Sequence, residues 1–347
     1  MDDFVKRWTP EELTRLLRLQ GNLSRGNIIA IEITKVFETP PSNLAKITVT
    51  YSPDVPVDSP KFILLKIPKA HKLLRGKREI DFYTKIAPLL TNIPLVPCVT
   101  TFYEQKTGIS YLFLKDVSAT HTTKERDKIS LLQFQLILDA LACLHAKLWD
   151  YPNLEDLVGE SPQEYFKKEY INNENNYKAL VEQLKEQIII DERKIFEKFL
   201  TNASKLILKR VENGRNMTLC HPENHHENFL LPYQNNNGYA YIIDWHQYRY
   251  WWGAKDIVSL VNRCLVPEKM HLVPNLLQFY YRKLVEYGVK NYSWDDCQND
   301  YRLGIIDYLT IILQLQEAYN KYPVRFMEIY QGIIQEFNKW ECASILF

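Results

Sequence analysis

A change in hydrophobic periodicity divides the sequence at about Lys115. Before this point, three runs rich in β-branched residues follow one another with short connections, at 28–38, 44–52 and 60–69. Such runs are typical of strands, and their spacing predicts an antiparallel meander. After this point, apolar residues recur at helical spacing, most clearly over 129–151. The chain is therefore expected to contain a sheet region followed by a helical region.

Further elements complete this prediction for the N-terminal region. Thr9 and Pro10 form a typical helix start, with Thr9 as the N-cap and Pro10 at the first helical position. A helical pattern covers 78–90, and one more strand is expected over 108–117. The N-terminal region is thus predicted to be a small sheet with a helix packed on it.

The C-terminal region has helical patterns over 163–212 and again from Pro274 onward, around one short β segment. We therefore predict an α+β, bilobal fold. A small N-terminal lobe with an antiparallel sheet would comprise residues 1–115, and a larger, mainly helical lobe would comprise 116–347. A hinge is expected near 111–118.

Composition excludes several classes of protein. Hydrophobic residues make up 46% and charged residues 24% of the 347 residues, values typical of an ordinary globular protein. Because 43 Lys and Arg residues face 42 Asp and Glu residues, no overall basic field supports a nucleic-acid partner. The sequence starts with an acidic stretch, and no apolar run approaches the ~20 residues that span a bilayer. We expect a cytoplasmic protein without a membrane partner.

The six cysteines are widely separated and form no C-x-x-C pair, so neither a zinc site nor a disulfide framework is predicted. They are expected to be small buried side chains. Nothing in the sequence indicates an oligomeric state.

Residues 221–228, HPENHHEN, are unusually polar and lie before two apolar runs. These runs, with Asn237-Gly238 between them, predict a β-hairpin. Counting outward from a five-residue loop places Asn228 opposite Asp244 at the open end of the hairpin. An amide and a carboxylate oxygen next to a polar loop suit Mg²⁺.

These motifs resemble those of the aminoglycoside phosphotransferase and choline kinase-like superfamily, whose members share the protein-kinase fold. HPENHHEN followed by IDW is similar to the H-G-D-x-x-x-x-N and I-D motifs of that superfamily. Lys66 lies where the superfamily has its nucleotide-binding strand lysine, and Glu79 matches the helix glutamate that pairs with it. The segments YLFLKDV, LACLHAKLW and WWGAKDI also resemble the superfamily, especially its ecdysteroid kinase-like branches.

The resemblance implies an ATP- or GTP-dependent phosphotransferase that uses Mg²⁺ and a small-molecule hydroxyl acceptor. Lys66, held by Glu79, would contact the nucleotide phosphates. Asn228 and Asp244 would hold Mg²⁺ against the phosphate oxygens.

Two residues of the polar loop and one later aspartate would complete the catalytic arrangement. Glu223 occupies the position of the catalytic aspartate, which orients the proton of the acceptor hydroxyl. His221 would anchor the loop, and Asp256 would tie the loop to the helices.

The sequence departs from the superfamily pattern at two places. ETPPSN replaces the Gly-rich phosphate loop, which leaves the backbone amides of Ser42 and Asn43 as the candidates for phosphate binding. Glu223 stands in place of Asp and is longer by one methylene group. Because a displacement of about 1 Å can cost ~10²-fold in rate, these departures favour an alternative, a pseudokinase that binds nucleotide or a partner without phosphoryl transfer.

Structural explanations exist for most of these residues. A lysine such as Lys66 is usually an edge residue facing water, and a helix glutamate such as Glu79 is usually solvated. His145 is expected to be a hydrogen-bonded core residue. Three further histidines are candidate zinc ligands, namely His225, His226 and His246. They are expected instead to be exposed loop residues. Trp251 and Trp252 are either core anchors or a wall of the acceptor pocket.

Overall fold

The computed structural model describes residues 7–233 and 238–347, which group into two compact units. The first unit runs to Thr122 and also contains Leu230–Gln247. The second unit contains Thr123–Phe229 and Tyr248–Phe347. The predicted boundary at Lys115 thus differs from the boundary between these units, because a late segment of the chain, Leu230–Gln247, belongs to the first unit.

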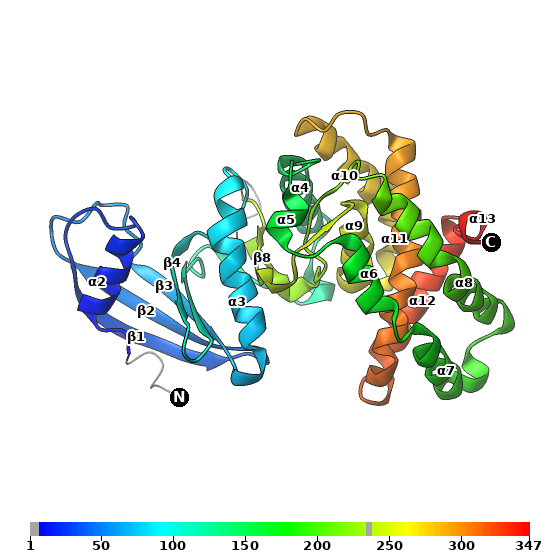
Figure 1. The fold of residues 1–347 in the computed structure, drawn as a ribbon, viewed down its shortest axis with the longest axis horizontal. Coiled ribbons are helices and arrows are strands. Elements are labelled where there is room, and N and C mark those ends of the chain that lie inside the picture. Colours follow the sequence, from blue (N-terminus) through cyan, green and yellow to red (C-terminus); the bar gives the residue numbers. More distant parts are fainter. Residues whose placement is uncertain (1–6, 234–237) are drawn as a thin grey trace. The chain divides into compact units, whose positions relative to one another are not determined.

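An antiparallel sheet forms the centre of the first unit (Figure 1). Its strand order is β1-β2-β3-β5-β4, and every neighbouring pair is antiparallel. The strands are β1 (Ile28–Glu38), β2 (Ser42–Tyr51), β3 (Phe62–Pro68), β4 (Cys98–Glu104) and β5 (Ile109–Lys115). The four predicted strands are confirmed, whereas β4 was not predicted.

One face of this sheet packs against helix α2 (Pro10–Leu19), whose predicted N-cap Thr9 accepts a hydrogen bond from the backbone N–H of Glu12. Side chains alternate along a strand, so β3 places Ile63, Leu65 and Ile67 together in the core on this face. Burying each such side chain contributes roughly 1.5–3 kcal/mol, which fixes the register of β3.

Helix α3 (Leu73–Asp81) contacts strands β3, β4 and β5 of the same sheet (Figure 1). It continues into a π-helical turn, Phe82–Ile86, and a 3₁₀ turn, Ala87–Leu89. The predicted helix over 78–90 therefore exists, but it begins five residues earlier and changes its hydrogen-bonding pattern near its end.

A small sheet contains the late segment of the first unit. Its order is β6-β8-β9, with β6 (His121–Thr122), β8 (Phe229–Pro232) and β9 (Tyr241–Ile242). The predicted hairpin thus has its two strands, while most of its predicted turn, 234–237, lies outside the described residues. A further bridge joins Ile242 to Leu95. The chain then enters a short 3₁₀ turn, Trp245–Gln247.

The second unit is mainly helical, as predicted (Figure 1). It has one small sheet, in which β7 (Thr218–Cys220) pairs with β10 (Arg249–Trp251). Its helices are α4 (Leu131–Lys147), α5 (Leu154–Val158), α6 (Pro162–Tyr170), α7 (Asn173–Leu184), α8 (Ile190–Glu212), α9 (Ala254–Cys264), α10 (Val273–Glu286), α11 (Trp294–Leu315), α12 (Pro323–Lys339) and α13 (Ala343–Leu346). Helix α4 packs on α10, and α9 packs on α11.

Local sequence explains where several of these helices begin. Ser130 and Gln133 form a reciprocal capping box at the start of α4, and Ser293 and Asp296 form another at α11. Each box satisfies two backbone N–H groups that the first turn leaves without partners. The six cysteines are free, and four of them are buried as expected, whereas Cys98 and Cys143 are half-buried.

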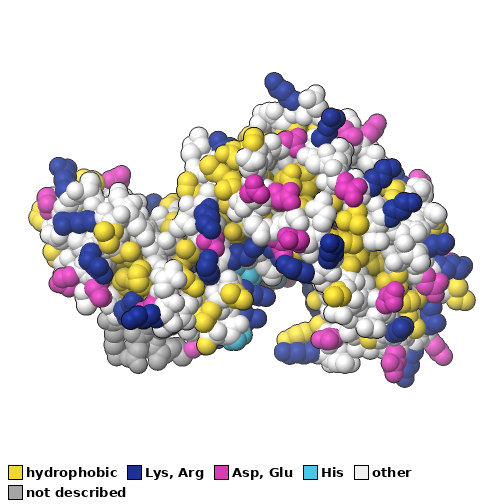
Figure 2. All heavy atoms as spheres, viewed as in Figure 1, with side chains coloured by type: hydrophobic (Ala, Val, Ile, Leu, Met, Phe, Trp, Pro, Cys, Tyr) yellow, Lys and Arg dark blue, Asp and Glu magenta, His cyan; other side chains and the backbone are white. Residues whose placement is uncertain are grey.

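The surface carries both signs of charge. On the face drawn in Figure 2, Lys and Arg side chains lie among Asp and Glu side chains, in keeping with their nearly equal numbers. Among the helices of the described residues, none has both the length and the apolar character that crossing a bilayer requires.

Candidate functional site

Lys66 lies on β3, the central strand of the five-stranded sheet, and pairs in register with Leu44 on one side and Leu112 on the other. It therefore does not occupy an edge position. Because its neighbours Leu65 and Ile67 point into the α2 core, Lys66 points to the opposite face. The sheet thus directs Lys66 toward helix α3.

Glu79 on α3 meets this lysine. Its side chain is buried, and its carboxylate accepts from Lys66 Nζ at 2.7 and 2.9 Å. A glutamate at this position is therefore not a solvated helix charge. Burial of a carboxylate without a partner would be costly, so the ion pair explains why Glu79 tolerates its position.

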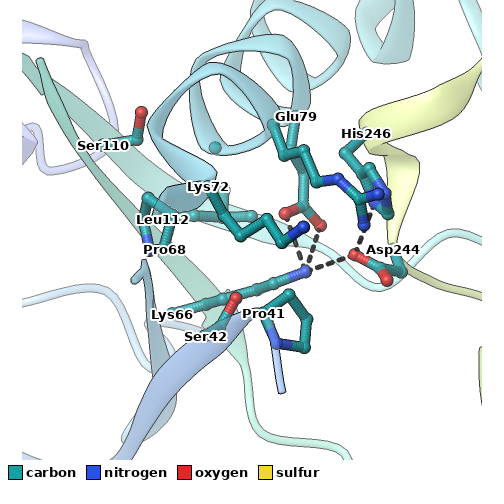
Figure 3. A pocket seen from close by; sticks show the side chains of 12 residues that line it. Pro41, Ser42, Lys66, Pro68, Lys72, Glu79, Ser110, Leu112, Asp244 and His246 are labelled. Atoms are coloured by element: carbon teal, nitrogen blue, oxygen red, sulfur yellow. Dashed lines mark hydrogen bonds and ion pairs between the residues drawn. The ribbon is translucent and has the colours of Figure 1, made fainter. Parts of the chain in front are cut away.

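Asp244 supplies a second carboxylate to the same lysine. Its Oδ1 lies 2.6 Å from Lys66 Nζ and 3.0 Å from His246 Nδ1 (Figure 3). Asp244 adopts a φ of 68°, a left-handed conformation that only a few non-glycine residues use. Strained backbone of this kind is concentrated at functional sites, where the surrounding structure maintains it.

An aromatic stack joins the segments that carry these two carboxylates. Phe82, three residues after Glu79, stacks on Trp245 with ring centroids 4.0 Å apart and planes 3° from parallel. Trp245 directly follows Asp244, and its indole N–H donates to the carbonyl of Ile242 at 3.0 Å. The stack therefore fixes the Asp244 segment against the end of α3.

The three charged groups shift one another's pKa. Burial disfavours the charge of Lys66, but the carboxylates of Glu79 and Asp244 outweigh burial and raise its pKa. Burial would raise the pKa of Asp244, yet Lys66 and His246 lower it well below its usual range. Burial, together with the charge of Asp244, raises the pKa of Glu79 despite its contact with Lys66. Asp244 is thus the carboxylate that holds its negative charge most firmly.

A small pocket opens beside this cluster (Figure 3). Its walls come from the β1–β2 turn, β3, the first turns of α3, β5 and the segment after β9. The lining residues are Pro41, Ser42, Lys66, Pro68, Lys72, Arg75, Gly76, Glu79, Ser110, Leu112, Asp244 and His246. The pocket therefore combines three cationic side chains with two carboxylates.

The polar loop of the second unit is held by Asp256 of α9, which is almost fully buried. The backbone N–H of His221 donates to Asp256 Oδ2 at 2.5 Å, and the Asn224 amide donates to the Asp256 carbonyl at 3.2 Å. One turn later on α9, the Ser259 hydroxyl donates to the carbonyl of Pro222 at 2.9 Å. Asp256 thus ties the loop to a helix, in the way that the resemblance implied.

His145 supports the same aspartate from α4 and is fully buried. Its Nε2 lies 3.2 Å from Asp256 Oδ2, and its Nδ1 lies 2.8 Å from the Tyr280 hydroxyl. A Cβ on Gly253 would lie 2.5 Å from that hydroxyl and 2.7 Å from His145 Nδ1, so only glycine fits between them. The prediction of a hydrogen-bonded core histidine is confirmed.

Glu223 and Asn228 occupy the loop that these contacts hold. Glu223 is half-buried, and its carbonyl accepts from the Asn228 side-chain amide at 2.9 Å. Asn228 makes this bond through its amide nitrogen and not through Oδ1. Asp244 contacts Lys66 and His246 through Oδ1 and not through Oδ2. Amide and carboxylate oxygens, such as those of Asn228 and Asp244, are each hard donors of the kind that Mg²⁺ prefers.

The eight predicted site residues are divided between the two units. Lys66, Glu79 and Asp244 contact one another in the first unit. Ser42 lies in the wall of the pocket beside them. His221, Glu223 and Asn228 lie on one loop of the second unit. The predicted pairing of Asn228 with Asp244 stays a prediction.

The β1–β2 turn uses its backbone amides internally. The Ser42 N–H donates to Thr39 Oγ1 at 3.2 Å, and Asn43 lies in the ladder between Glu38 and Ile67. These contacts reduce the capacity of Ser42 and Asn43 to bind phosphate through their backbone.

The burial of three large side chains decides two expectations from the sequence. Trp251 and Trp252 are both buried and stack at 5.1 Å, so they are core anchors. His246 is also buried, which corrects the expectation of an exposed loop position. It is held by Asp244, a contact that no sequence period reveals. His225 and His226 are half-buried.

Sequence reasoning also missed Lys72, Arg75 and Ser110 as lining residues of the pocket. The only available signal was the density of cations in KAHKLLRGKR, directly after the strand that carries Lys66.

Solved structures with the same fold include several small-molecule kinases. A complex of an aminoglycoside 2'-phosphotransferase-IIIa point variant with GDP is 15% identical, with a TM-score of 0.51, covering 97% of this chain and 99% of that chain. An ethanolamine kinase from Plasmodium vivax is 14% identical, with a TM-score of 0.55, covering 89% and 83%. The ADP-bound aminoglycoside phosphotransferase APH(2'')-Ib is 15% identical, with a TM-score of 0.50, covering 92% and 97%.

These similarities confirm the predicted protein-kinase-like fold. A search of curated protein sequences finds no match. The model of the ecdysteroid kinase-like family matches residues 42–291, a span that includes both the Lys66 cluster and the polar loop. The chain therefore belongs to the ecdysteroid kinase-like family.

Proposed function

We propose that the protein is an ATP-dependent phosphotransferase that transfers the γ-phosphate to a hydroxyl group of a small molecule. The observation that carries this proposal is the buried cluster in which Lys66 contacts both Glu79 and Asp244. A lysine with two carboxylates at a pocket wall is suited to bind phosphate on one side and to organise a metal ligand on the other. Solved relatives that are complexes with GDP and ADP further support a nucleotide as the ligand.

Each residue of the site has a role in this proposal. Lys66 binds the nucleotide phosphates, and Glu79 holds the ammonium group in place. Asn228 and Asp244 would hold Mg²⁺ through their amide and carboxylate oxygens, and the ion would neutralise the charge on the phosphates.

Glu223 orients the acceptor hydroxyl and receives its proton as the oxygen attacks phosphorus. His221 fixes the backbone of the loop through its N–H bond to Asp256. Since phosphoryl transfer depends mainly on positioning, a glutamate can replace aspartate where the loop compensates for the added methylene. Pro222 fixes one backbone torsion directly before Glu223 and contributes to that placement.

The pseudokinase alternative is favoured by two specific observations. The Ser42 amide is already bonded within the β1–β2 turn, and Glu223 is longer than the residue that the superfamily uses. Such a protein would bind nucleotide in the same pocket without transferring phosphate.

The decisive experiment measures ADP release from Mg·ATP with a panel of hydroxylated small molecules. The proposed kinase shows acceptor-dependent turnover with at least one compound, and Glu223→Gln abolishes that turnover while nucleotide affinity is nearly unchanged. Saturating Mg·ATP should also raise the melting temperature, because the ligand binds the native state. Nucleotide binding without turnover across the panel supports the pseudokinase, whereas a folded protein that binds no nucleotide contradicts both.

A further inference from the structure

The pocket beside Lys66 contains two cations that have no acidic partner. Lys72 and Arg75 both line it and are half-buried, and neither side chain forms an ion pair or hydrogen bond within residues 7–233 and 238–347. Nearby cations behave differently, since Lys69 pairs with Glu38 at 2.9 Å and Lys77 pairs with Asp81 at 2.9 Å. Partly buried cations without a counter-charge are uncommon because burial disfavours charge.

These cations lie on the side of α3 that carries Glu79. Arg75 precedes Glu79 by four residues on the helix, so the two side chains share one face, and Lys72, the N-cap residue of α3, lines the same pocket. Figure 3 shows the Lys72 side chain extending toward Glu79 and Lys66. Gly76, between them, lets the first turn of α3 approach Pro68 at the end of β3.

The charges of the pocket depend on these two residues. Lys66 is matched by the carboxylates of Glu79 and Asp244, so these three groups together are negative. Lys72 and Arg75 reverse this balance and make the pocket positive. A positive pocket attracts an anionic ligand, and a polyphosphate offers several acceptor oxygens for charge-assisted hydrogen bonds.

A second feature of the same pocket also indicates a ligand. Among the residues that the structure describes, the hydroxyl of Ser110 finds no hydrogen-bond partner, although Ser110 is 2% exposed and lines the pocket. A buried hydroxyl without a partner is costly, and a polar ligand group in the pocket would remove that cost.

We propose that Lys72 and Arg75 form a cationic clamp that binds the polyphosphate chain of the nucleotide. Side-chain cations from the start of α3 thereby replace the backbone amides of a Gly-rich loop. This replacement accounts for the turn 38–43, whose Ser42 amide is committed to Thr39. The inference rests on the proposed nucleotide site and adds two phosphate-binding residues to it.

Calorimetric titration of the full-length protein tests the clamp, with Mg·ATP, Mg·ADP, adenosine and inorganic tripolyphosphate as probes. Lys72→Ala and Arg75→Ala should each weaken Mg·ATP and tripolyphosphate binding by about 10- to 100-fold, as the loss of a charge-assisted bond predicts, and leave adenosine binding unchanged. Lys77→Ala is the matched control, because it removes an exposed lysine of the same helix that pairs with Asp81. Lys72→Arg and Arg75→Lys should recover most of the affinity.

The outcomes separate this inference from the proposed function. If the folded wild-type protein binds none of the four probes, the proposed nucleotide site itself is wrong. If it binds Mg·ATP and the alanine variants match Lys77→Ala, the clamp is wrong while the site stands. Equal losses for adenosine and Mg·ATP would indicate a structural role of Lys72 and Arg75, and would also overturn the clamp.

Discussion

Gly76 of α3 packs directly against Pro68, the last residue of β3. A Cβ at position 76 would lie 3.0 Å from both Cβ and Cδ of Pro68 and nearer still to its Cγ. The rigid proline ring cannot move away as a flexible side chain could. This close approach brings α3 to the strand that carries Lys66, and it positions Glu79 opposite that lysine.

Gly76→Ala should therefore weaken nucleotide binding by displacing α3, even though alanine favours a helix over glycine by about 1 kcal/mol. The measurement is the Kd of Mg·ATP by calorimetry, with circular dichroism to confirm that helix content is retained. Gly332→Ala is the control, because a Cβ on this α12 residue would make only an ordinary 3.4 Å contact with Asn262. Equal affinities for the two variants would contradict this role of Gly76.

The sequence predicted the residues whose position follows from a local period. Lys66 interrupts an apolar strand, and alternation alone sends it to the face opposite Leu65. Strand β1 was predicted with its observed bounds because its β-branched run ends at a proline turn. The Asp256 anchor followed from its place in a motif rather than from periodicity.

Most of the features that were missed depend on tertiary contacts. Strand β4 is an exception, because CVTTFYE is as long as β3 and β5 and is rich in β-branched and aromatic residues, which are typical of strands. The first five residues of α3, Leu73–Lys77, include Gly76, which is a poor helix former, and two cations, and together these obscure the helical pattern. The burial of His246 results from its contact with Asp244, a relationship that a single sequence does not encode as a pattern.

Replacement of Asp300 should strongly destabilise the second unit. The Arg210 guanidinium donates to Asp300 through Nε at 2.6 Å and Nη2 at 2.9 Å, and Tyr292 adds a third bond at 3.1 Å. Both charged side chains are nearly buried, so Asp300→Asn leaves the guanidinium without its counter-charge and should cost about 3–5 kcal/mol.

Urea unfolding measures this loss, and Asp191→Asn is its control. Asp191 pairs with Lys194 on the surface, where loss of an ion pair costs about 0–1 kcal/mol. Similar unfolding midpoints for the two variants would show that the buried pair does not contribute as argued.

The cysteines should react slowly with thiol reagents in the native protein. Burial raises the pKa of Cys98, Cys264 and Cys342 to about 12 in each case. At about pH 8 such a thiol is ionised to roughly one part in 10⁴, against roughly a quarter for an ordinary cysteine. Cys143, which is half-buried and has a smaller rise in pKa, should react first.

Titration with a chromogenic disulfide in the presence and absence of urea tests this order, and mass spectrometry identifies the modified residue. Rapid native labelling of Cys264 at the rate of the unfolded chain would contradict its buried position.

The last prediction concerns Asp256, whose carboxylate contacts the polar loop through one oxygen, Oδ2. Asp256 Oδ2 accepts from the His221 backbone N–H at 2.5 Å, and it also accepts from His145 Nε2 at 3.2 Å in the neutral tautomer with a proton on Nε2. Asp256→Asn keeps the side-chain shape but weakens both bonds, because a neutral amide oxygen replaces a carboxylate. Losses of about 1.5–3 kcal/mol are typical for hydrogen bonds to charged groups.

This loss should be local to the loop and visible without any substrate. Hydrogen exchange should accelerate at the amides of residues 218–228 in Asp256→Asn, while the amides of β3 and α3 in the first unit exchange at their wild-type rates. Tyr280→Phe is a graded control, since it removes only the hydroxyl that contacts His145 Nδ1 and should have a smaller effect. Once an acceptor substrate is identified, Asp256→Asn should lower turnover and leave the Kd of Mg·ATP nearly unchanged, because the substitution displaces Glu223 and not Lys66. Wild-type exchange at the His221 amide in this variant would show that the loop holds its conformation without Asp256.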